Sequence, residues 1–484
     1  MTGFLALFVC TVGVLGLFYL DRDRSAPTSK ALWLPVMWLW IVGSRPASAW
    51  LGFREAGADP AQLLEGSPVD RLVFEILLGI GIVVLIRRGS RTRALLAANW
   101  PILIYFVYCL LSILWSDFPG VAFKRWTKAI GDLVMVLIVL SEADQVAAIK
   151  RLLARVGFVL LPFSILLIKY FGQLGRSYDP DGNPMNTGVT TNKNSLGVIT
   201  LVIALGVLWR VRVLLRANKD EPGRRRRLVA NGVLLTFAVL LLAMAHSATS
   251  TVCFALGAVL TFSTGLPAIR GRPWAVHALV VLIVLVSAVT MLLGGAEGAL
   301  HAIGRQSNLT GRTDIWNAVI PVAPNAVIGA GFESFWLGPR LYQVWARLPS
   351  IYMHVDEAHN GYLEIYLNLG LVGVSFVVLI LLSGYLSAVA AFRRDPMFGS
   401  LLLTYVAAAA IYGVSEAAFR MLCPAWIFLV LAVVASRGSF RGVGSWQGVG
   451  ATADDVLQLS PMMPSGAWPR TTMSSELCAR SKYN

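Results

Sequence analysis

The segment His354-Val355-Asp356-Glu357-Ala358-His359 places two imidazoles and two carboxylates within six residues. Such side chains transfer protons or bind divalent metals. Their spacing is not the His-Glu-x-x-His pattern of a helical zinc protease. A divalent ion that bridges substrate phosphates remains one interpretation, but with cationic side chains nearby none is required. We therefore predict no metal and no other cofactor.

Other chemistries lack their usual motifs. No persuasive pair of carboxylates indicates a retaining glycosidase, and neither a phosphate-binding Gly-Lys-Ser/Thr loop nor a dinucleotide fingerprint occurs. The five cysteines are scattered and contain no Cys-x-x-Cys pair, so they indicate neither a disulfide framework nor a zinc site.

Composition identifies the solvent that surrounds the elements carrying these residues. Of 484 residues, 56% are hydrophobic and 14% are charged, against about 25% charged in soluble domains. Such a chain must face lipid over most of its surface. The net charge of +15 does not indicate nucleic-acid binding, because the basic residues lie in short runs between apolar stretches, as at membrane flanks.

Apolar runs long enough to cross a bilayer predict thirteen membrane spans, with an uncertainty of one or two. They lie near residues 3–20, 31–44, 70–86, 97–115, 126–141, 151–170, 195–214, 228–245, 248–266, 274–293, 361–391, 401–415 and 418–436. We thus expect an all-α, polytopic transmembrane helix bundle of about 11–13 spans.

The distribution of Lys and Arg predicts the orientation. Alternating spans put 22 of the 41 basic residues in the loops 21–30, 87–93, 142–155, 210–227, 267–273 and 392–395 and at the span ends beside them. By the positive-inside rule these loops are cytoplasmic. The C-terminus then faces the cytoplasm, and residues 294–360 form a large loop on the outer side.

These boundaries divide the chain into four parts: helices 1–10 with short loops (1–293), the large loop (294–360), the C-terminal helices (361–436) and a tail (437–484). The tail is rich in Gly, Ser and Met and is predicted to be disordered. Structureless loops as long as the large loop are uncommon and are usually functional, so we expect this loop to have a function.

Three motifs around the large loop resemble the O-antigen ligase/Wzy-type polymerase superfamily. The segment from Ala358 to Gly373, with the His359-Asn360 pair and Asn368-Leu-Gly-Leu-Val-Gly, is similar to the family signature. Gly311-Arg312 with Trp316, and Gly329-Ala-Gly331 with Phe332, resemble two further family elements. The order and spacing of all three match. The resemblance also includes the arrangement of membrane spans and extends over about residues 70–436. It implies a GT-C-like fold.

Two more segments are similar to the exopolysaccharide-polymerase branch: Trp115-Ser-Asp-Phe-Pro119 and Thr191-Asn-Lys-Asn-Ser-Leu-Gly197. One position departs from the family pattern. Members often carry a basic residue after Ser near the eighth-to-ninth turn, where this chain reads His246-Ser-Ala-Thr-Ser250. His246 is the candidate substitute.

The resemblance implies glycan transfer from a polyprenyl diphosphate donor to an acceptor hydroxyl at the outer membrane face. The protein must then neutralise the diphosphate, a task suited to the guanidinium fork of Arg312. It must also deprotonate the acceptor, a task suited to neutral His359. Glu333 is the third candidate catalytic residue, to orient the acceptor or an arginine. A solvated loop arginine, a helix-capping histidine and an exposed carboxylate are the respective structural alternatives.

Basic side chains on outer loops oppose the general charge bias, and lipid phosphates would explain them, as would snorkelling to the interface. Asn360 is also a helix-capping candidate, and Glu364 a packed polar residue. The candidate substrate-binding residues are Arg176, Lys193, Arg125, Lys124, Asn360 and Glu364.

The leading interpretation is a multi-pass enzyme of the bacterial inner membrane that polymerises lipid-linked glycan repeats, with its large loop periplasmic. Its expected partners are the polyprenyl diphosphate-linked donor, a glycan or lipid acceptor and the bilayer, with a chain-length regulator or a flippase as further candidates. A ligase that attaches the glycan to a lipid or protein is the main alternative. A polar-solute transporter fits less well, because ionisable residues cluster at span ends rather than at mid-membrane depth. A structural scaffold would need neither His359 nor Arg312.

Overall fold

The computed structural model describes residues 3–23, 28–53, 66–178, 182–266, 269, 272–292, 309–349 and 355–438. Three predictions fall mainly outside these residues: the disordered tail 437–484, the first part of the large loop and the role of His354.

Nearly all regular structure in the described part of the chain is α-helical. The N-terminal half contains α1 (Gly3–Leu20), η1 (Lys30–Leu32), α2 (Trp33–Val42), α3 (Ala47–Trp50), α5 (Pro68–Arg87), α6 (Gly89–Ala98), α7 (Trp100–Leu111), η2 (Ser112–Trp115), α8 (Pro119–Leu140), α9 (Gln145–Tyr170), α10 (Gly172–Gly175) and α11 (Lys193–Arg216). Between α10 and α11, β1 (Arg176–Tyr178) and β2 (Pro184–Asn186) pair as a short antiparallel hairpin.

The C-terminal half contains α12 (Arg224–Ala245), α13 (Ala248–Ser263), α15 (Pro273–Leu292), α17 (Leu309–Val319), η3 (Ile320–Val322), α18 (Gly338–Trp345), α19 (Gly361–Arg394), α20 (Pro396–Ser415) and α21 (Pro424–Arg437). Each of the thirteen predicted spans overlaps one of these helices or, at 97–115, the pair α7 and η2.

Six helices of the described ranges are long and apolar enough to cross a membrane: α1, α9, α11, α12, α19 and α20. A seventh crossing results if α6 and the α7–η2 segment, bent by 87°, count as one span, and three shorter apolar helices accompany them. The prediction of an all-α, polytopic membrane bundle is confirmed. The number of crossings by this criterion is lower than predicted, because several apolar runs form short, bent or more polar helices.

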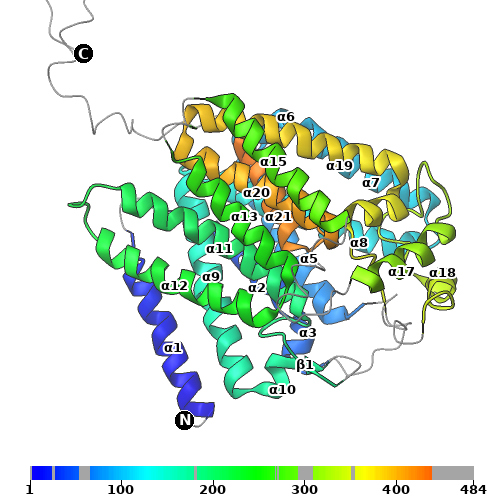
Figure 1. The fold of residues 1–484 in the computed structure, drawn as a ribbon, viewed down its shortest axis with the longest axis horizontal. Helices are drawn as coiled ribbons and strands as arrows, with labels where there is room; N and C mark the ends of the chain where they lie inside the picture. Colours follow the sequence, from blue (N-terminus) through cyan, green and yellow to red (C-terminus); the bar gives the residue numbers. More distant parts are fainter. Residues whose placement is uncertain are drawn as a thin grey trace, which may run out of the picture. The chain divides into compact units, whose positions relative to one another are not determined.

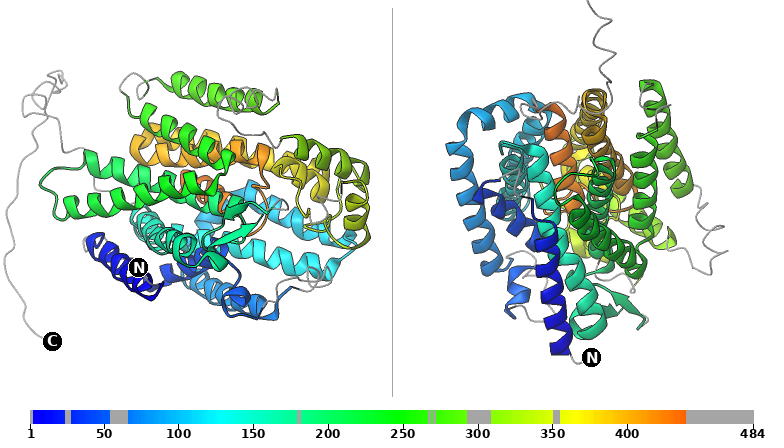
Figure 2. Two further views of the ribbon diagram at one scale, coloured as in Figure 1. Left: turned by 60° about the horizontal axis from the view of Figure 1, so that its bottom comes forward. Right: turned by 90° about the vertical axis from the view of Figure 1, so that its left-hand side faces the viewer.

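The helices α19, α20 and α21 pack against one another, with α20 and α21 in the middle of the bundle and α19 on one side of them (Figures 1 and 2). Helices α7 and α8 contact this central group, as do α11 and α13. Helix α21 is buried along almost its whole length, as expected of a helix that is apolar on every side. By contrast, α1 is mostly exposed and presents its apolar side chains outward, where lipid would cover them.

Charged loops gather at two ends of the bundle. At one end, ion pairs join Arg210 to Asp21 and Arg227 to Asp23, and Arg88 binds Glu142. These residues belong to loops, or to span ends beside them, that the charge distribution assigns to the cytoplasm. The other end carries residues 309–349, 355–364 and 416–422, and we call it the site end.

Helix α19 is interrupted at Gly370, which has φ 63° and ψ −166°. The backbone groups freed by the interruption pair with residues 326–331 of the large loop. Ala330 and Gly331 donate N–H to the carbonyls of Leu367 and Asn368 (3.0 and 2.8 Å), and Leu371 donates to Ala326 (2.9 Å). Buried backbone groups need such partners. The Gly329-Ala-Gly331 and Asn368-Leu-Gly370 motifs thus form one structural joint.

The described part of the large loop folds over the start of α19. Helices α17 and α18 form a small apolar core with this start, which includes Ile315, Phe335, Val344 and Leu367. The indole of Trp316 donates to the carbonyl of Ala358 (2.8 Å), directly before His359. The loop therefore positions side chains of α17 beside the residues that precede α19.

Candidate active site

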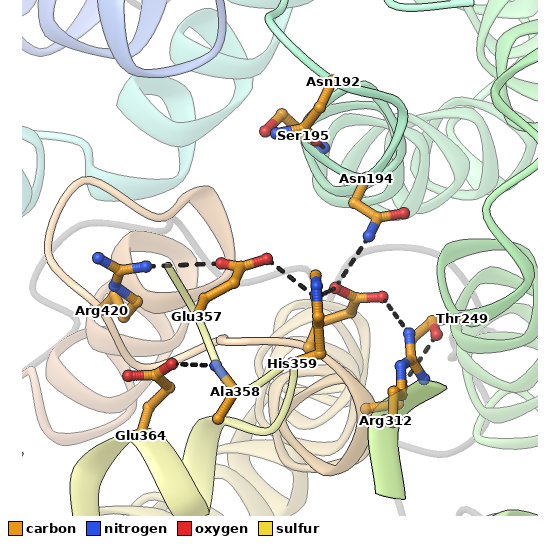
Figure 3. A network of polar contacts seen from close by, with 12 residues as sticks. Asn192, Asn194, Ser195, Thr249, Arg312, Glu357, Ala358, His359, Glu364 and Arg420 are labelled. Carbon is orange, nitrogen blue, oxygen red and sulfur yellow. Dashed lines mark hydrogen bonds and ion pairs between the residues drawn. The ribbon is translucent and has the colours of Figure 1, made fainter. Parts of the chain in front are cut away.

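Polar side chains from five segments meet at the site end of the bundle, and Figure 3 shows most of them. They come from the start of α11, the start of α17, the loop after η3, the residues before α19, and the loop between α20 and α21. The residues are Asn194, Arg312, Glu333, Glu357, His359, Glu416 and Arg420. We call this group the polar cluster.

Glu416 connects the two residues that the family resemblance singles out. Its Oε1 lies 2.7 Å from Nη2 of Arg312, and its Oε2 lies 3.5 Å from Nδ1 of His359. The amide of Asn194 also donates to Oε2, at 3.2 Å. Only 5% of the Glu416 side chain is exposed, so its charge depends on these partners.

His359 lies between two carboxylates. Its Nδ1 is 2.9 Å from Oε1 of Glu357, a charge contact rather than a well-aligned hydrogen bond. Burial would lower the pKa of His359, but Glu357 and Glu416 outweigh it and raise the pKa to about 10. The imidazole is therefore protonated at neutral pH. Within the described residues its ion pairs use Nδ1, which leaves Nε2 for a substrate.

Arg420 completes the cluster from the other side of Glu357 (Figure 3). Its Nη1 lies 3.5 Å from Oε2 of Glu357 and its Nη2 lies 3.4 Å from Oε2 of Glu333. Burial would raise the pKa of Glu357, but His359, Arg420 and Arg312 together lower it to about 2. Glu357 is thus a carboxylate at every physiological pH.

Two predicted catalytic residues have strained backbones. Glu333 has φ 50° and His359 has φ 47°, and neither is glycine. Left-handed conformations of bulky residues cost of order 1–3 kcal/mol and concentrate at functional sites. The alternative reading of Glu333 as an exposed carboxylate does not describe its position, since only 7% of its side chain is exposed. Its carbonyl also accepts a hydrogen bond from Arg125.

A buried carboxylate of α8 holds the loop that carries Glu416 and Arg420. Asp132 accepts the backbone N–H of Leu422 and the indole N–H of Trp38, each at 2.8 Å. Leu422 also has a positive φ of 56°. These bonds fix the end of the loop, so Asp132 is a positioning residue.

Asn360 and Glu364 support the segment that bears His359. The side chain of Asn360 caps α19 by accepting from the N–H groups of Tyr362 and Leu363, both at 3.0 Å. Glu364 is buried and accepts from Trp336 and from the N–H of Ala358. Their predicted contact with substrate stays a prediction.

The other predicted binding residues lie at different distances from the polar cluster. Arg125 reaches it through Glu333, and Lys124 precedes Arg125 on α8. Lys193 is the first residue of α11, next to Asn194. Arg176 lies on β1, where it donates to the carbonyl of Ile168 (3.1 Å), and none of the described ion pairs joins it to the cluster.

Sequence reasoning did not select Glu416, Arg420, Glu357 or Asn194 as site residues. Glu416 lies between the twelfth and thirteenth predicted spans, and Arg420 is the only charged residue within the thirteenth, 418–436. Charged residues between or within apolar spans are costly near lipid, and this signal would have identified them. Near the turn that departs from the family pattern, the hydroxyl of Thr249 lies 2.9 Å from that of Ser415, which precedes Glu416.

Glu357, His359 and Glu416 are the group that could hold a metal ion in the described residues. One ligand atom from each lies within 4.8 Å of the others. Arg312 and Arg420 already neutralise these carboxylates, so a cation would have to displace a guanidinium group. A diphosphate, which guanidinium groups bind directly, fits this set of side chains better.

Comparisons with known proteins agree with the motifs. Residues 232–378 match the family described as O-antigen ligase. The chain is also 27% identical over 323 residues to the exopolysaccharide production protein ExoQ of Rhizobium meliloti (strain 1021), covering 63% of this chain and 70% of that protein. The predicted resemblance is confirmed.

Proposed function

We propose that this chain, which is similar to the O-antigen ligase and polymerase superfamily, is a membrane glycosyltransferase that polymerises glycan repeats carried on polyprenyl diphosphate. The observation that carries the proposal is the shared carboxylate of Glu416, which brings Arg312 and His359 to one place. Such a transfer needs a group that neutralises the leaving diphosphate and a group that deprotonates the acceptor. A guanidinium group and an imidazole can serve these two functions.

The donor diphosphate would bind to arginine side chains that now pair with carboxylates. Arg312 and Arg420 have Glu416 and Glu357 as their respective partners. A diphosphate bears more charge than a carboxylate and accepts bidentate hydrogen bonds from guanidinium groups. We propose that it replaces the carboxylate of Glu416 on Arg312.

The transfer forms one bond and breaks one. The acceptor oxygen forms a bond to the anomeric carbon of the donor sugar, while the bond from that carbon to the diphosphate oxygen breaks. The electron pair of the broken bond leaves with the diphosphate, which Arg312 neutralises. The hydroxyl proton goes to Nε2 of the neutral form of His359, which is a minor fraction at neutral pH because the pKa of His359 is about 10. The energy comes from the donor bond, so the proposed reaction requires no cofactor or metal.

Glu357 and Glu416 support His359 in the way a carboxylate supports the histidine of a catalytic triad. They contact Nδ1 and stabilise the imidazolium that forms. Both carboxylates are paired with cations. The pKa of Glu357, near 2, makes this residue a weak base, so His359 in its neutral form is a stronger proton acceptor than Glu357.

The similarity to an exopolysaccharide production protein favours polymerase over ligase. The family description, O-antigen ligase, favours a ligase that transfers to a lipid or protein acceptor. Glycan profiles of a deletion strain distinguish them: short unpolymerised repeats indicate a polymerase, and long lipid-linked chains without a surface anchor indicate a ligase. A flippase and a chain-length regulator are proposed partners of either.

We place the site end in the periplasm and the C-terminus in the cytoplasm, because the opposite end carries the arginine-rich loops. Cysteine labelling of intact cells tests this orientation.

The test of the function itself is transfer by the full-length protein in vesicles containing a lipid-linked glycan. We expect His359→Ala to reduce product by about 10²-fold or more, as for loss of a general base, without loss of membrane insertion. The matched control is His277→Ala, since His277 contacts Tyr385 between α15 and α19. Full activity of His359→Ala would refute the proposal.

A further inference from the structure

A second group of basic side chains surrounds a pocket between the start of α5 and the first turns of α8. Its cavity volume is ≈ 180 Å³, comparable with the roughly 150 Å³ of a cavity that admits benzene. The pocket therefore admits a group the size of a phosphate or diphosphate. The lining residues that matter here are Arg71, Phe74, Lys124, Arg125, Lys128 and Met421.

The pocket has an excess of positive charge. Its one acidic residue, Glu75, is bonded to Arg71 at 2.7 Å. The lining also contains three further basic residues, Lys124, Arg125 and Lys128, so basic residues outnumber acidic ones in the pocket. The Lys128 ammonium lies 5.7 Å from the ring of Phe74. Such a concave surface attracts anions.

The neighbouring surface indicates that the anion arrives on a lipid. Helices α5 and α8 present exposed apolar side chains beside the pocket, including Leu72 (58% exposed), Ile76 (51%) and Phe123 (51%). In a membrane protein these faces contact acyl chains. A charged pocket beside a lipid-facing surface fits an amphiphile, whose headgroup enters while its chain stays in the bilayer.

Two features connect the pocket to the polar cluster. Arg125 lines the pocket and also donates to the carbonyl of Glu333. Met421 lines it and follows Arg420, which binds Glu333 and Glu357. A ligand in the pocket would therefore lie beside the Arg420 side of the polar cluster. Arg312 belongs to another part of the cluster, where it pairs with Glu416.

We propose that this pocket binds the phosphate or diphosphate headgroup of a second lipid, separate from the donor headgroup at Arg312. The inference rests on the proposed function for its biological meaning: a polymerase whose acceptor is itself lipid-linked needs two headgroup sites. An anionic phospholipid offers the same chemistry, and the experiment distinguishes the two sources.

The experiment counts lipids on the full-length protein in nanodiscs by native mass spectrometry. The probes are undecaprenyl diphosphate and phosphatidylglycerol. We expect two undecaprenyl diphosphates per wild-type chain and one for the double variant Lys124→Gln, Lys128→Gln. The dissociation constant of the lost site should rise about tenfold or more, as for loss of charge-assisted hydrogen bonds.

Three controls make the result specific. Lys169→Gln removes a lysine at the same end of the bundle but outside the pocket, and it should bind as wild type. Lys124→Arg with Lys128→Arg keeps the charge and should retain the second lipid. Arg312→Gln should lose the other site. Competition by phosphatidylglycerol identifies a phospholipid source, and its absence identifies the lipid diphosphate.

Unchanged lipid binding by the Lys124→Gln, Lys128→Gln variant would overturn the proposal. The proposed function can fail separately. Suppose that the wild-type protein transferred no glycan, but that the Lys124→Gln, Lys128→Gln variant bound one lipid fewer than the wild type. The pocket proposal would then be supported and the glycosyltransferase proposal refuted.

Discussion

Arg312 and His359 contact opposite oxygens of one carboxylate, that of Glu416. The two residues are separated by 47 positions in the sequence, and the shared partner fixes their distance. A substrate anion that displaces Glu416 from Arg312 also changes the charge beside His359. Binding of the leaving group and activation of the acceptor are thereby coupled through a single side chain.

Arg312→Gln should reduce kcat/KM for the lipid diphosphate donor by about 10- to 100-fold, the usual effect of losing a charge-assisted hydrogen bond to a buried partner. Arg312→Lys should recover part of the loss, because a lysine keeps the charge but lacks the planar fork. Transfer assays with varied donor concentration measure both. Arg340→Gln is the control, since Arg340 pairs with an exposed Asp117. Equal losses in the Arg312 and Arg340 variants would contradict the donor role.

The pH dependence follows from the raised pKa of His359, about 10. As a base, His359 must be neutral, so the rate should rise with pH and level off near 10. Glu357→Gln removes one carboxylate that favours the imidazolium, so it should lower this pKa and move the rising limb to lower pH. Rate profiles of the wild type and the variant measure the shift. A rate that instead falls as pH passes 10 would mean that the imidazolium is the active form.

Glu416→Ala should affect stability and activity together. Loss of the carboxylate leaves Arg312 and Asn194 without this partner and removes one charge beside His359. Breaking a buried pair costs about 3–5 kcal/mol; because 22% of the Arg312 side chain is exposed, solvent should reduce the effect. We expect a lower Tm in detergent and at least a tenfold loss of transfer. Glu416→Gln keeps the shape and should preserve more of the Tm than of the activity. If both variants kept wild-type activity, Glu416 would not couple the two residues.

The helices were predictable because each helix that crosses a bilayer needs its own long apolar run, which can be recognised without knowledge of the other segments. The predicted span 3–20 coincides with α1, and 228–245 lies within α12. The predicted site residues Arg312, Glu333 and His359 do meet in one cluster. Their partners Glu416 and Arg420 were not predicted, because the pattern of apolar residues does not indicate which loops contact one another in the fold. The interruption at Gly370 was also missed, because α19 reads as one continuous apolar run.

The joint between the large loop and α19 provides the last prediction. Gly370 has φ 63°, and a Cβ at this position would overlap the backbone of Val327; at Gly329, with φ 67°, it would overlap the backbone of Asn368. Gly370→Ala should therefore separate the loop from α19 and displace Arg312 from His359, with a cost of about 1–3 kcal/mol from the backbone strain alone. We expect both a lower Tm and a loss of transfer. Gly79→Ala and Gly232→Ala are matched controls in α5 and α12, where an added Cβ meets no atom within 4 Å, and alanine favours a helix. Because the joint determines where α17 lies, a Gly370→Ala protein with wild-type Tm and activity would show that the polar cluster forms without it.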